Sequence, residues 1–305
     1  MKYELKISNA IEQNGKIDLI RLANIAEGIH KIASGALHIR LGGISIIKGR
    51  KKDALKKSLK VTLSGIAEGS TILKLESEQF KDTLDPFQLD LFKSESQISL
   101  QEQTPISLFV DSFKEVIEKD GKSDLLDKSL LKELKSFQNA FLKNDETFTI
   151  TNEGTFESLE LDQKSFDQIN ILEEETPPSE PIILNGTVEE LKYSKLRVKI
   201  ITEEGTVNGF LSDLLSAEDI SSYWGKEITI TGINHYKSNK NSLVEITDIH
   251  QPGVGDKYFS KKTKKSLSVE EQIKEQAERK AGNRLSAIAG KWPGNERLED
   301  LTKML

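Results

Sequence analysis

The sequence of 305 residues contains no cysteine, and this absence excludes a disulfide framework, a thiolate nucleophile and a cysteine-ligated metal. It also lacks an apolar run of about 18 residues, so no transmembrane helix is predicted. No charged and then apolar leader opens the chain, and seven prolines and 20 glycines are too few for collagen-like or long low-complexity sequence. Together these absences favour a cytoplasmic bacterial protein.

The motifs of the common catalytic sites are missing as well. There is no Gly-x-x-x-x-Gly-Lys-Ser/Thr loop, no Gly-x-Gly-x-x-Gly after a strand, no His-Glu-x-x-His and no Gly-x-Ser-x-Gly. His30 and His38 are too far apart along a helix to share a metal, and His235 and His250 would need help from a carboxylate such as Asp248. We therefore expect no enzyme activity, no cofactor and no metal. An enzyme with an unfamiliar carboxylate site stays open as an alternative.

Charge is distributed unevenly along the chain. Residues 251–305 carry 12 Lys/Arg against 8 Asp/Glu, a balance of +4, whereas residues 1–250 carry 31 against 41, a balance of −10. An acidic body with a basic tail is not typical of a protein that coats nucleic acid with its main surface. The tail either contacts something acidic or is a solvated linker.

Two segments divide the sequence. Residues 173–181 hold three glutamates and then three prolines, a composition that disfavours a helix interior or a central strand and predicts an extended linker. The run Gln251-Pro252-Gly253-Val254-Gly255 ends the last β-rich stretch. The predicted organisation is an α+β domain over 1–172, an acidic proline-rich linker over 173–181, a small β-barrel over 182–250, and a basic linker with a helical tail over 251–305.

The first domain contains apolar residues at both the spacing of strands and the spacing of helices. Alternating apolar residues predict a strand at 3–7 and a hairpin over 59–75, and helical spacing predicts one helix from Leu19 to Ala36 with its buried face on Leu19, Leu22, Ala26, Ile29, Ala33 and Ala36. Thr104-Pro105 predicts the start of a second helix, and a third follows the break at Gly121. Phe148 to Leu159 indicates another short hairpin. Residues 80–99 have no clear period and are expected to form a loop.

Five short β-rich runs and one helix make up the middle domain. The runs are 182–188, 196–201, 207–211, 228–233 and 244–249, and Ser216 is the expected cap of the helix. The segments Gly186-Thr187-Val188, Leu196-Arg197-Val198 and Tyr223 to Gly232, with the phrase Gly-Lys-x-Ile-x-Ile-x-Gly, resemble an OB-like small β-barrel. That resemblance implies that bases stack on exposed aromatics, for which the candidates are Tyr193, Phe210, Tyr223, Trp224 and Tyr236. Aromatic residues of such barrels are more often part of the core, and that alternative stays open.

Two lysine-rich segments carry the candidate phosphate contacts. Residues 48–60 hold seven Lys/Arg and one aspartate. Residues 257–265 hold five lysines and no acidic residue. Such a density can bind phosphates through counterion release, but a solvated loop is the more common explanation and an acidic partner is another. The candidate contacts are Lys48, Arg50, Lys51, Lys52, Lys56, Lys57, Lys261, Lys262, Lys264 and Lys265.

The end of the chain carries apolar residues with little local core. Pro293-Gly294 predicts a turn that presents Trp292, and a short helix capped by Asn295 would place leucines on one face. The ending Trp-Pro-Gly-Asn-Glu resembles those of some uncharacterised bacterial proteins and of partner-binding tails in toxin–antitoxin pairs. The candidate partner contacts are Trp292, Pro293, Leu298, Leu301 and Leu305.

These observations favour a non-catalytic protein that binds another protein through its C-terminal tail, in an antitoxin-like or defence-operon accessory role. The alternative from a different class is a nucleic-acid-binding protein that uses the OB-like barrel and the lysine-rich segments. One basic face with exposed aromatics on the barrel would favour the alternative. Docking of the tail on its own body also stays open.

Overall fold

The computed structural model describes residues 1–10, 12, 15–46, 53–67, 71–84, 100–119, 121–152, 158–192, 196–260 and 274. By internal contacts the chain divides into two units, Met1–Lys261 and Lys262–Leu305. The second unit is described only at Lys274, so the predicted helical tail lies outside the described residues. None of the described helices is both long enough and apolar enough to span a membrane.

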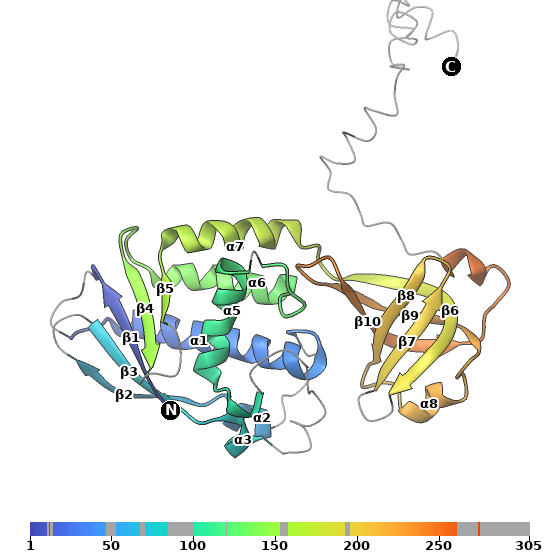
Figure 1. Ribbon diagram of the computed structural model, residues 1–305, viewed down its shortest axis with the longest axis horizontal. Coiled ribbons are helices and arrows are strands. Elements are labelled where there is room, and N and C mark those ends of the chain that lie inside the picture. Colours follow the sequence, from blue (N-terminus) through green and yellow to red (C-terminus); the bar gives the residue numbers. More distant parts are fainter. Residues whose placement is uncertain are drawn as a thin grey trace, which may run out of the picture. The chain divides into compact units, whose positions relative to one another are not determined.

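The first part of the chain is a five-stranded antiparallel sheet with helices (Figure 1), in the strand order β2-β3-β1-β4-β5. Its strands are β1 (Lys2–Ser8), β2 (Val61–Ala67), β3 (Thr71–Ser77), β4 (Thr147–Asn152) and β5 (Leu159–Leu161). The helices are α1 (Leu19–Gly42), α2 (Asp53–Ser58), α3 (Phe80–Thr83), α5 (Pro105–Ile117), α6 (Lys128–Ser136) and α7 (Gln163–Glu175), with single turns η1 (Leu100–Glu102) and η2 (Phe137–Ala140).

The alternation expected at the start of the chain is confirmed, because Tyr3, Leu5 and Ile7 are buried while their neighbours in β1 are exposed. Both expected hairpins form as antiparallel pairs, β2 with β3 and β4 with β5. The helix expected after Thr104-Pro105 is α5, whose N-cap Thr104 accepts a hydrogen bond from the backbone of Ser107.

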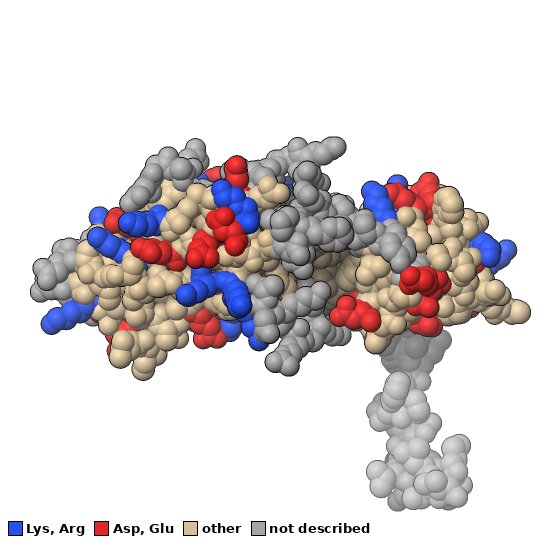
Figure 2. Space-filling model, turned by 90° about the horizontal axis from the view of Figure 1, so that it is seen from below, with Lys and Arg blue, Asp and Glu red and all other residues tan. Residues whose placement is uncertain are grey.

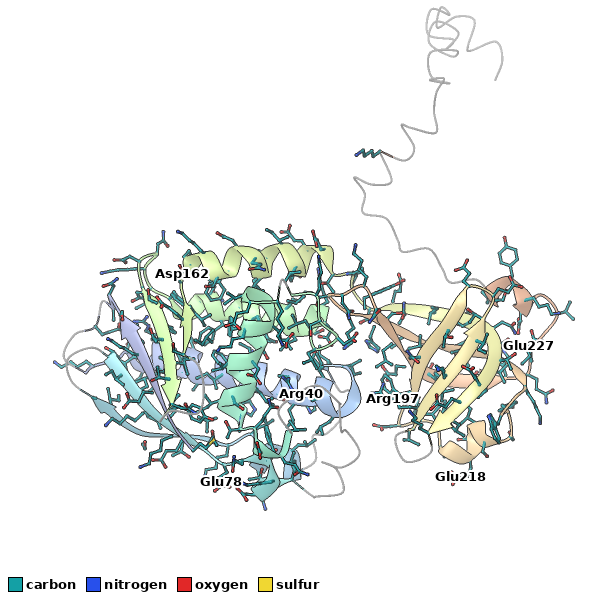
Figure 3. All side chains as sticks on the ribbon, viewed as in Figure 1. Arg40, Glu78, Asp162, Arg197, Glu218 and Glu227 are labelled. Carbon is teal, nitrogen blue, oxygen red and sulfur yellow. The ribbon has the colours of Figure 1, made fainter. Side chains whose placement is uncertain are left out.

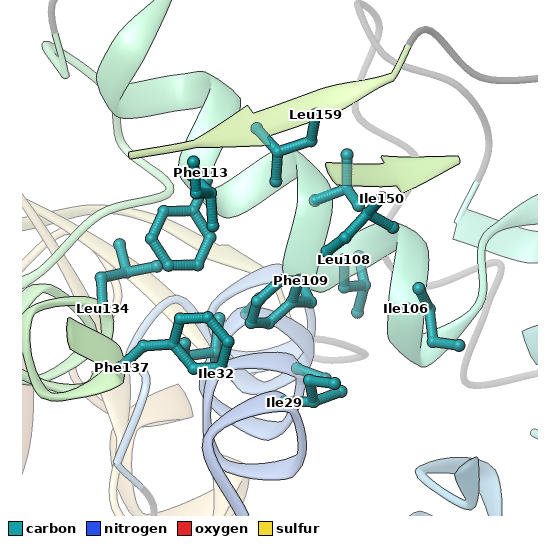
Figure 4. Close-up of a cluster of buried hydrophobic side chains, with 14 of the residues drawn as sticks. Ile29, Ile32, Ile106, Leu108, Phe109, Phe113, Leu134, Phe137, Ile150 and Leu159 are labelled. Atoms are coloured by element: carbon teal, nitrogen blue, oxygen red, sulfur yellow. The ribbon is translucent and has the colours of Figure 1, made fainter. Parts of the chain in front are cut away.

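Buried aliphatic and phenylalanine side chains fill the space between the sheet and the helices, and Phe109, Phe113 and Phe137 lie among isoleucines and leucines (Figure 4). The ring centroids of Phe109 and Phe113 are 5.0 Å apart, as are those of Phe109 and Phe137, and Phe113 meets Phe166 edge-on at 6.2 Å. All four rings are buried. Tilted and edge-to-face rings at these distances add a geometric preference to the burial of a large apolar area.

The predicted buried face of the first helix is wrong in part. The structure buries Arg21, Ile25, Ile29 and Ile32 along α1, whereas Leu19 is 79% exposed. Ala26, also expected inside, is exposed. Leu19 lies in the first, exposed turn of α1, and the buried face includes Arg21. A prediction from apolar residues alone therefore chose a face rotated away from the one that is buried.

The predicted extended linker over 173–181 is also corrected. Helix α7 continues to Glu175 and strand β6 (Glu180–Lys192) begins at Glu180, so only residues 176–179 lie between them. Glu173 is buried, and its carboxylate pairs with Lys128 at 3.0 Å and with Lys135 at 3.4 Å. The three glutamates are therefore the last turn of helix α7 and not part of a linker. Although burial raises the pKa of Glu173, these lysines bring it below its usual value. Pro181 stands near the start of β6, where a proline is tolerated.

The rest of the unit is a closed five-stranded barrel, compatible with the expected OB-like barrel. Strands β8 and β10 pair in parallel, and the other neighbours are antiparallel, in the closed order β10-β8-β7-β6-β9. Besides β6, its elements are β7 (Arg197–Thr202), β8 (Gly205–Leu211), α8 (Ala217–Ser221), β9 (Glu227–Tyr236) and β10 (Ser242–His250), followed by the turn η4 (Asp256–Ser260). Ser216 caps α8, as expected.

The barrel has its own core of isoleucine, leucine and valine side chains, to which every strand contributes, among them Leu184 of β6 and Ile230 of β9. Two glycines permit its closure. A Cβ at Gly186 would clash with the carbonyl oxygen of Ile201, and one at Gly232 would clash with that of Glu245. The Gly-Lys-x-Ile-x-Ile-x-Gly phrase therefore ends on a residue that the strand spacing itself requires.

Candidate binding surfaces

OB-like barrels bind ligands on the face of their second and third strands and on the loops that join strands one to two and four to five. Here these elements are β7, β8, the segment before Leu196 and the loop at 237–241. Arg197 of β7 lies over the ring of Phe210 in β8 at 5.8 Å, and Phe210 stacks on His235 of β9 at 6.4 Å. Figure 3 labels Arg197 among the barrel side chains. The three side chains form a column on the expected ligand face.

Both ring nitrogens of His235 have a hydrogen-bond partner. Its Nδ1 lies 2.9 Å from the hydroxyl of Ser179, and its Nε2 lies 3.0 Å from the carboxylate of Glu245 in β10. Burial lowers the pKa of His235 below its usual value, and Glu245 opposes that shift. The imidazole is therefore a fixed part of the column.

The loop at 237–241 contacts the sheet-and-helix part of the same unit. The backbone N–H of Ser238 donates to the carbonyl of Leu126 at 3.0 Å. The side-chain amides of Asn239 and Asn241 donate to the carboxylate of Asp124 at 2.8 and 3.0 Å. The loop that would surround a ligand in an OB-like barrel is thus hydrogen-bonded within the chain.

Two barrel cations meet the C-terminal end of α1. Arg197 donates to the carbonyl of Gly42 at 3.0 Å, and Lys237 donates to the carbonyl of Gly43. The last carbonyls of a helix lack partners inside it and carry partial negative charge, so cations stabilise them. Gly43 has φ +87°, and a Cβ there would lie 2.8 Å from the Arg197 guanidinium, so glycine is needed for this approach.

Asp127 completes this contact. Its carboxylate accepts from the backbone and hydroxyl of Ser45 at 2.8 and 2.6 Å, caps α6 by accepting from the N–H of Leu130, and lies 3.8 Å from Lys237. Lys237 is only 5% exposed. Burial lowers the pKa of Lys237, and Asp127 opposes that effect. We refer to Arg197, Lys237, Asp127 and the carbonyls of Gly42 and Gly43 as the α1 clasp.

The expected aromatic candidates are not gathered on one surface. Phe210 belongs to the column, while Tyr223 packs against the barrel core and the hydroxyl of Tyr236 donates to Glu180. Trp224 is 70% exposed and its indole N–H donates to the carbonyl of Glu189 at 3.2 Å. Tyr193 lies outside the described residues. Sequence reasoning identified the aromatic Phe210, but it weighed His235 only as a metal ligand and gave Arg197 no binding role.

The described lysines of the lysine-rich segment 48–60 are exposed, whereas Ser58 and Leu59 between them are buried. Lys56 and Lys57 lie on α2, and Lys60 precedes β2. On the face drawn in Figure 2, basic and acidic side chains are interspersed over the described surface. Residues 182–250 hold seven Lys/Arg against ten Asp/Glu, a net charge of −3. The remaining candidate contacts lie outside the described residues: Lys48, Arg50, Lys51, Lys52, Lys261, Lys262, Lys264, Lys265, Trp292, Pro293, Leu298, Leu301 and Leu305.

Buried charges form a separate cluster that sequence reasoning missed. Arg21 of α1 pairs with Glu146 at 2.7 Å and also with Glu12, and Arg21 and Glu146 are almost completely buried. The carboxylate of Glu146 also accepts from the backbone of Leu142 at 2.7 Å. Such a cluster fixes the loop before β4 against the start of α1. Among the described residues, no group of three His, Cys, Asp or Glu side chains is arranged to hold a metal.

Comparisons of the chain with protein-family models, with curated proteins and with solved structures find no match.

Proposed function

We propose that this chain is a non-catalytic, cytoplasmic bacterial protein that binds another protein through its C-terminal tail, in an antitoxin-like or defence-operon accessory role. Trp292 and Pro293 form the anchor in this proposal. The leucine stripe behind them supplies the rest of the contact: Leu298, Leu301 and Leu305.

The observation that supports this proposal most is the α1 clasp. Arg197 of β7 and Lys237 of the loop at 237–241 donate to carbonyls of the same chain. The loop at 237–241 makes its hydrogen bonds there too. A ligand on that face would have to displace these contacts. The tail carries a large aromatic residue and leucines at helical spacing, and it follows a folded body in the chain.

The expected energetics follow from the anchor. Aromatic residues at the centre of an interface often carry most of its binding free energy, and their truncation costs about 2 kcal/mol or more. Pro293 limits the conformations available to the segment that presents Trp292, because its ring fixes φ, and Gly294 permits a turn after it. A short segment with this composition gains its stability on a partner surface, because it has too few apolar residues for a core of its own.

The test uses the two tryptophans of the chain as a matched pair. Trp292→Ala is expected to leave the melting temperature of the isolated protein unchanged and to abolish co-purification with its partner from the native host. Trp224→Ala, at the exposed tryptophan of the barrel, is the control and is expected to keep the partner. Both variants are measured by thermal melting and by affinity capture of the full chain.

Two results would contradict the proposal. A lower melting temperature in Trp292→Ala, with the same partners retained, would show that the tail docks on its own body. If Trp292→Ala keeps both its melting temperature and its partners, Trp292 neither stabilises the body nor binds the partner.

Nucleic-acid binding is the second candidate, and the observation that favours it is the column of Arg197, Phe210 and His235. Aromatic and guanidinium groups on such a face can stack bases. The net charge of −3 over 182–250 and the use of Arg197 in the α1 clasp weigh against it. Tight binding of single-stranded nucleic acid at physiological salt by Trp292→Ala protein would reverse the order of the two candidates, because phosphate contacts alone weaken steeply with salt.

A further inference from the structure

The two edges of the first sheet differ in how they are protected. Strand β5 is three residues long and carries Glu160, and short, charged edges resist pairing with other chains. Strand β2 is seven residues long, with the sequence VTLSGIA, and carries neither charge nor proline. Figure 1 shows β2 as the outer strand, and within the described ranges only β3 pairs with it.

Apolar side chains reach this open edge. Leu63 lies opposite Leu75 and Ile66 opposite Leu73, across a β-bulge in β2. Leu75 and Leu73 are buried on the side that the helices cover, so Leu63 and Ile66 belong to the same layer. Each of them is nevertheless 40% exposed. The apolar layer therefore continues to the edge of the sheet, where its outer members are only half covered.

We propose that β2 pairs with β2 of a second copy of this chain, in an antiparallel arrangement about a two-fold axis between Ser64 and Gly65. In that register Leu63 lies opposite Ile66 of the second copy, and Ile66 lies opposite its Leu63. Cross-strand apolar pairs are the unit that stabilises a sheet, and a two-fold axis makes each favourable pair twice. The two five-stranded sheets then become one continuous sheet with helices on the same face.

The lysines beside β2 favour this direction of pairing. Lys56 and Lys57 are exposed on α2, and Lys60 is exposed directly before the strand. An antiparallel pair places these lysines at opposite ends of the joined strands, whereas a parallel pair would bring like charges together. The basic tail of the chain is disfavoured at this edge for the same reason. The bulge twists the edge and limits the length over which two copies can pair.

The test measures the mass of the full chain in solution by light scattering over a range of concentrations. A dimer is expected, and Leu63→Lys is expected to weaken it roughly tenfold or more, because both Leu63–Ile66 pairs are lost and each new charge lies opposite the apolar Ile66 of the other copy. The matched control is Leu142→Lys, at a leucine that is 49% exposed and lies outside the sheet. The control is expected to dimerise as the unchanged chain does.

Hydrogen exchange of the unchanged chain gives a second measurement that does not depend on how a variant folds. Amides of β2 are expected to become protected as the concentration rises, while those of β5 stay as they were. A monomer at every soluble concentration would overturn the proposal. So would a dimer that Leu63→Lys does not weaken and whose β2 amides show no concentration dependence; a dimer lost in Trp292→Ala would assign the contact to the tail.

Discussion

The two cores of this chain are built from different side chains. Among the described residues, the core between the first sheet and its helices contains six buried phenylalanines, Phe109 and Phe113 among them. The barrel core consists of isoleucine, leucine and valine, and the aromatic side chain that packs against it, Tyr223, is half buried. Both parts belong to the unit Met1–Lys261 and differ in the shape of the space that they must fill.

That shape explains the difference. A sheet packed against helices leaves a wide layer, and large rings from several elements can meet across it. A closed barrel of five strands has a narrow interior, into which every strand directs alternate residues. Branched aliphatic side chains fit this interior and also suit the pleated backbone. The stability of the first core should therefore depend on single residues more than that of the second.

The largest effect is expected from Phe113→Ala. This ring is fully buried and meets Phe109, Phe137 and Phe166, so truncation leaves a cavity that its rigid neighbours cannot fill. The expected loss is about 3–5 kcal/mol of unfolding free energy, measured by denaturant titration. Phe113→Leu is the control and should lose less. A loss for Phe113→Ala no larger than that of an aliphatic change in the barrel would remove the contrast between the cores.

A smaller effect is expected from Lys237→Met, which removes one cation from the α1 clasp. Asp127 keeps its bonds to Ser45 and Leu130, so the expected loss is about 1–3 kcal/mol. In a Trp292→Phe background, in which Trp224 is the single tryptophan, its fluorescence reports on the barrel and should then change at a different temperature from the helical circular dichroism. Lys240→Met, at an exposed lysine of the same loop, is the control. Coincident and unchanged transitions in Lys237→Met would show that the clasp does not couple the two parts. The division into two folding domains stays a prediction until this is measured.

The smallest effect is expected from Ile230→Val in the barrel. Ile230 is fully buried, and the change removes one methyl group while it keeps the β-branched shape. The expected loss is about 0.5–1.5 kcal/mol, again measured by denaturant titration. Phe113→Leu, a conservative change in the other core, supplies the comparison. A loss that approaches the Phe113→Ala value would show that the barrel is packed as sensitively as the aromatic core.

The barrel could be predicted from the sequence because its signals are local. Its strands alternate with period two, and turn residues separate them. Helix α7 was missed because its acidic end resembled a linker, although Asp162 and Ser165 form a capping box that marks its start. The burial of Arg21 depends on Glu146, which lies 125 positions further along the chain. No local sequence pattern predicts a partner at that distance along the chain.

The candidate surfaces were predictable only in part. The aromatic Phe210 was a candidate from its residue type, but Arg197 and Lys237 bind main-chain carbonyls, and those acceptors have no residue signature. The open edge of β2 could not be inferred from the hairpin, because the order of strands in a sheet follows from tertiary pairing. Residue type indicates what chemistry a position can offer, and the fold determines where it is used.

The α1 clasp has a consequence for the order in which the chain assembles. A ribosome makes the chain from its N-terminus, at roughly 5–20 residues per second. Asp127 and the carbonyls of Gly42 and Gly43 are therefore synthesised before Lys237, and water must solvate them during that interval. A nascent chain can complete its aromatic core first and receive the barrel cations afterwards. The clasp thus closes only on a chain that has been translated through β9 and Lys237, whereas β10, which completes the barrel, is synthesised after them.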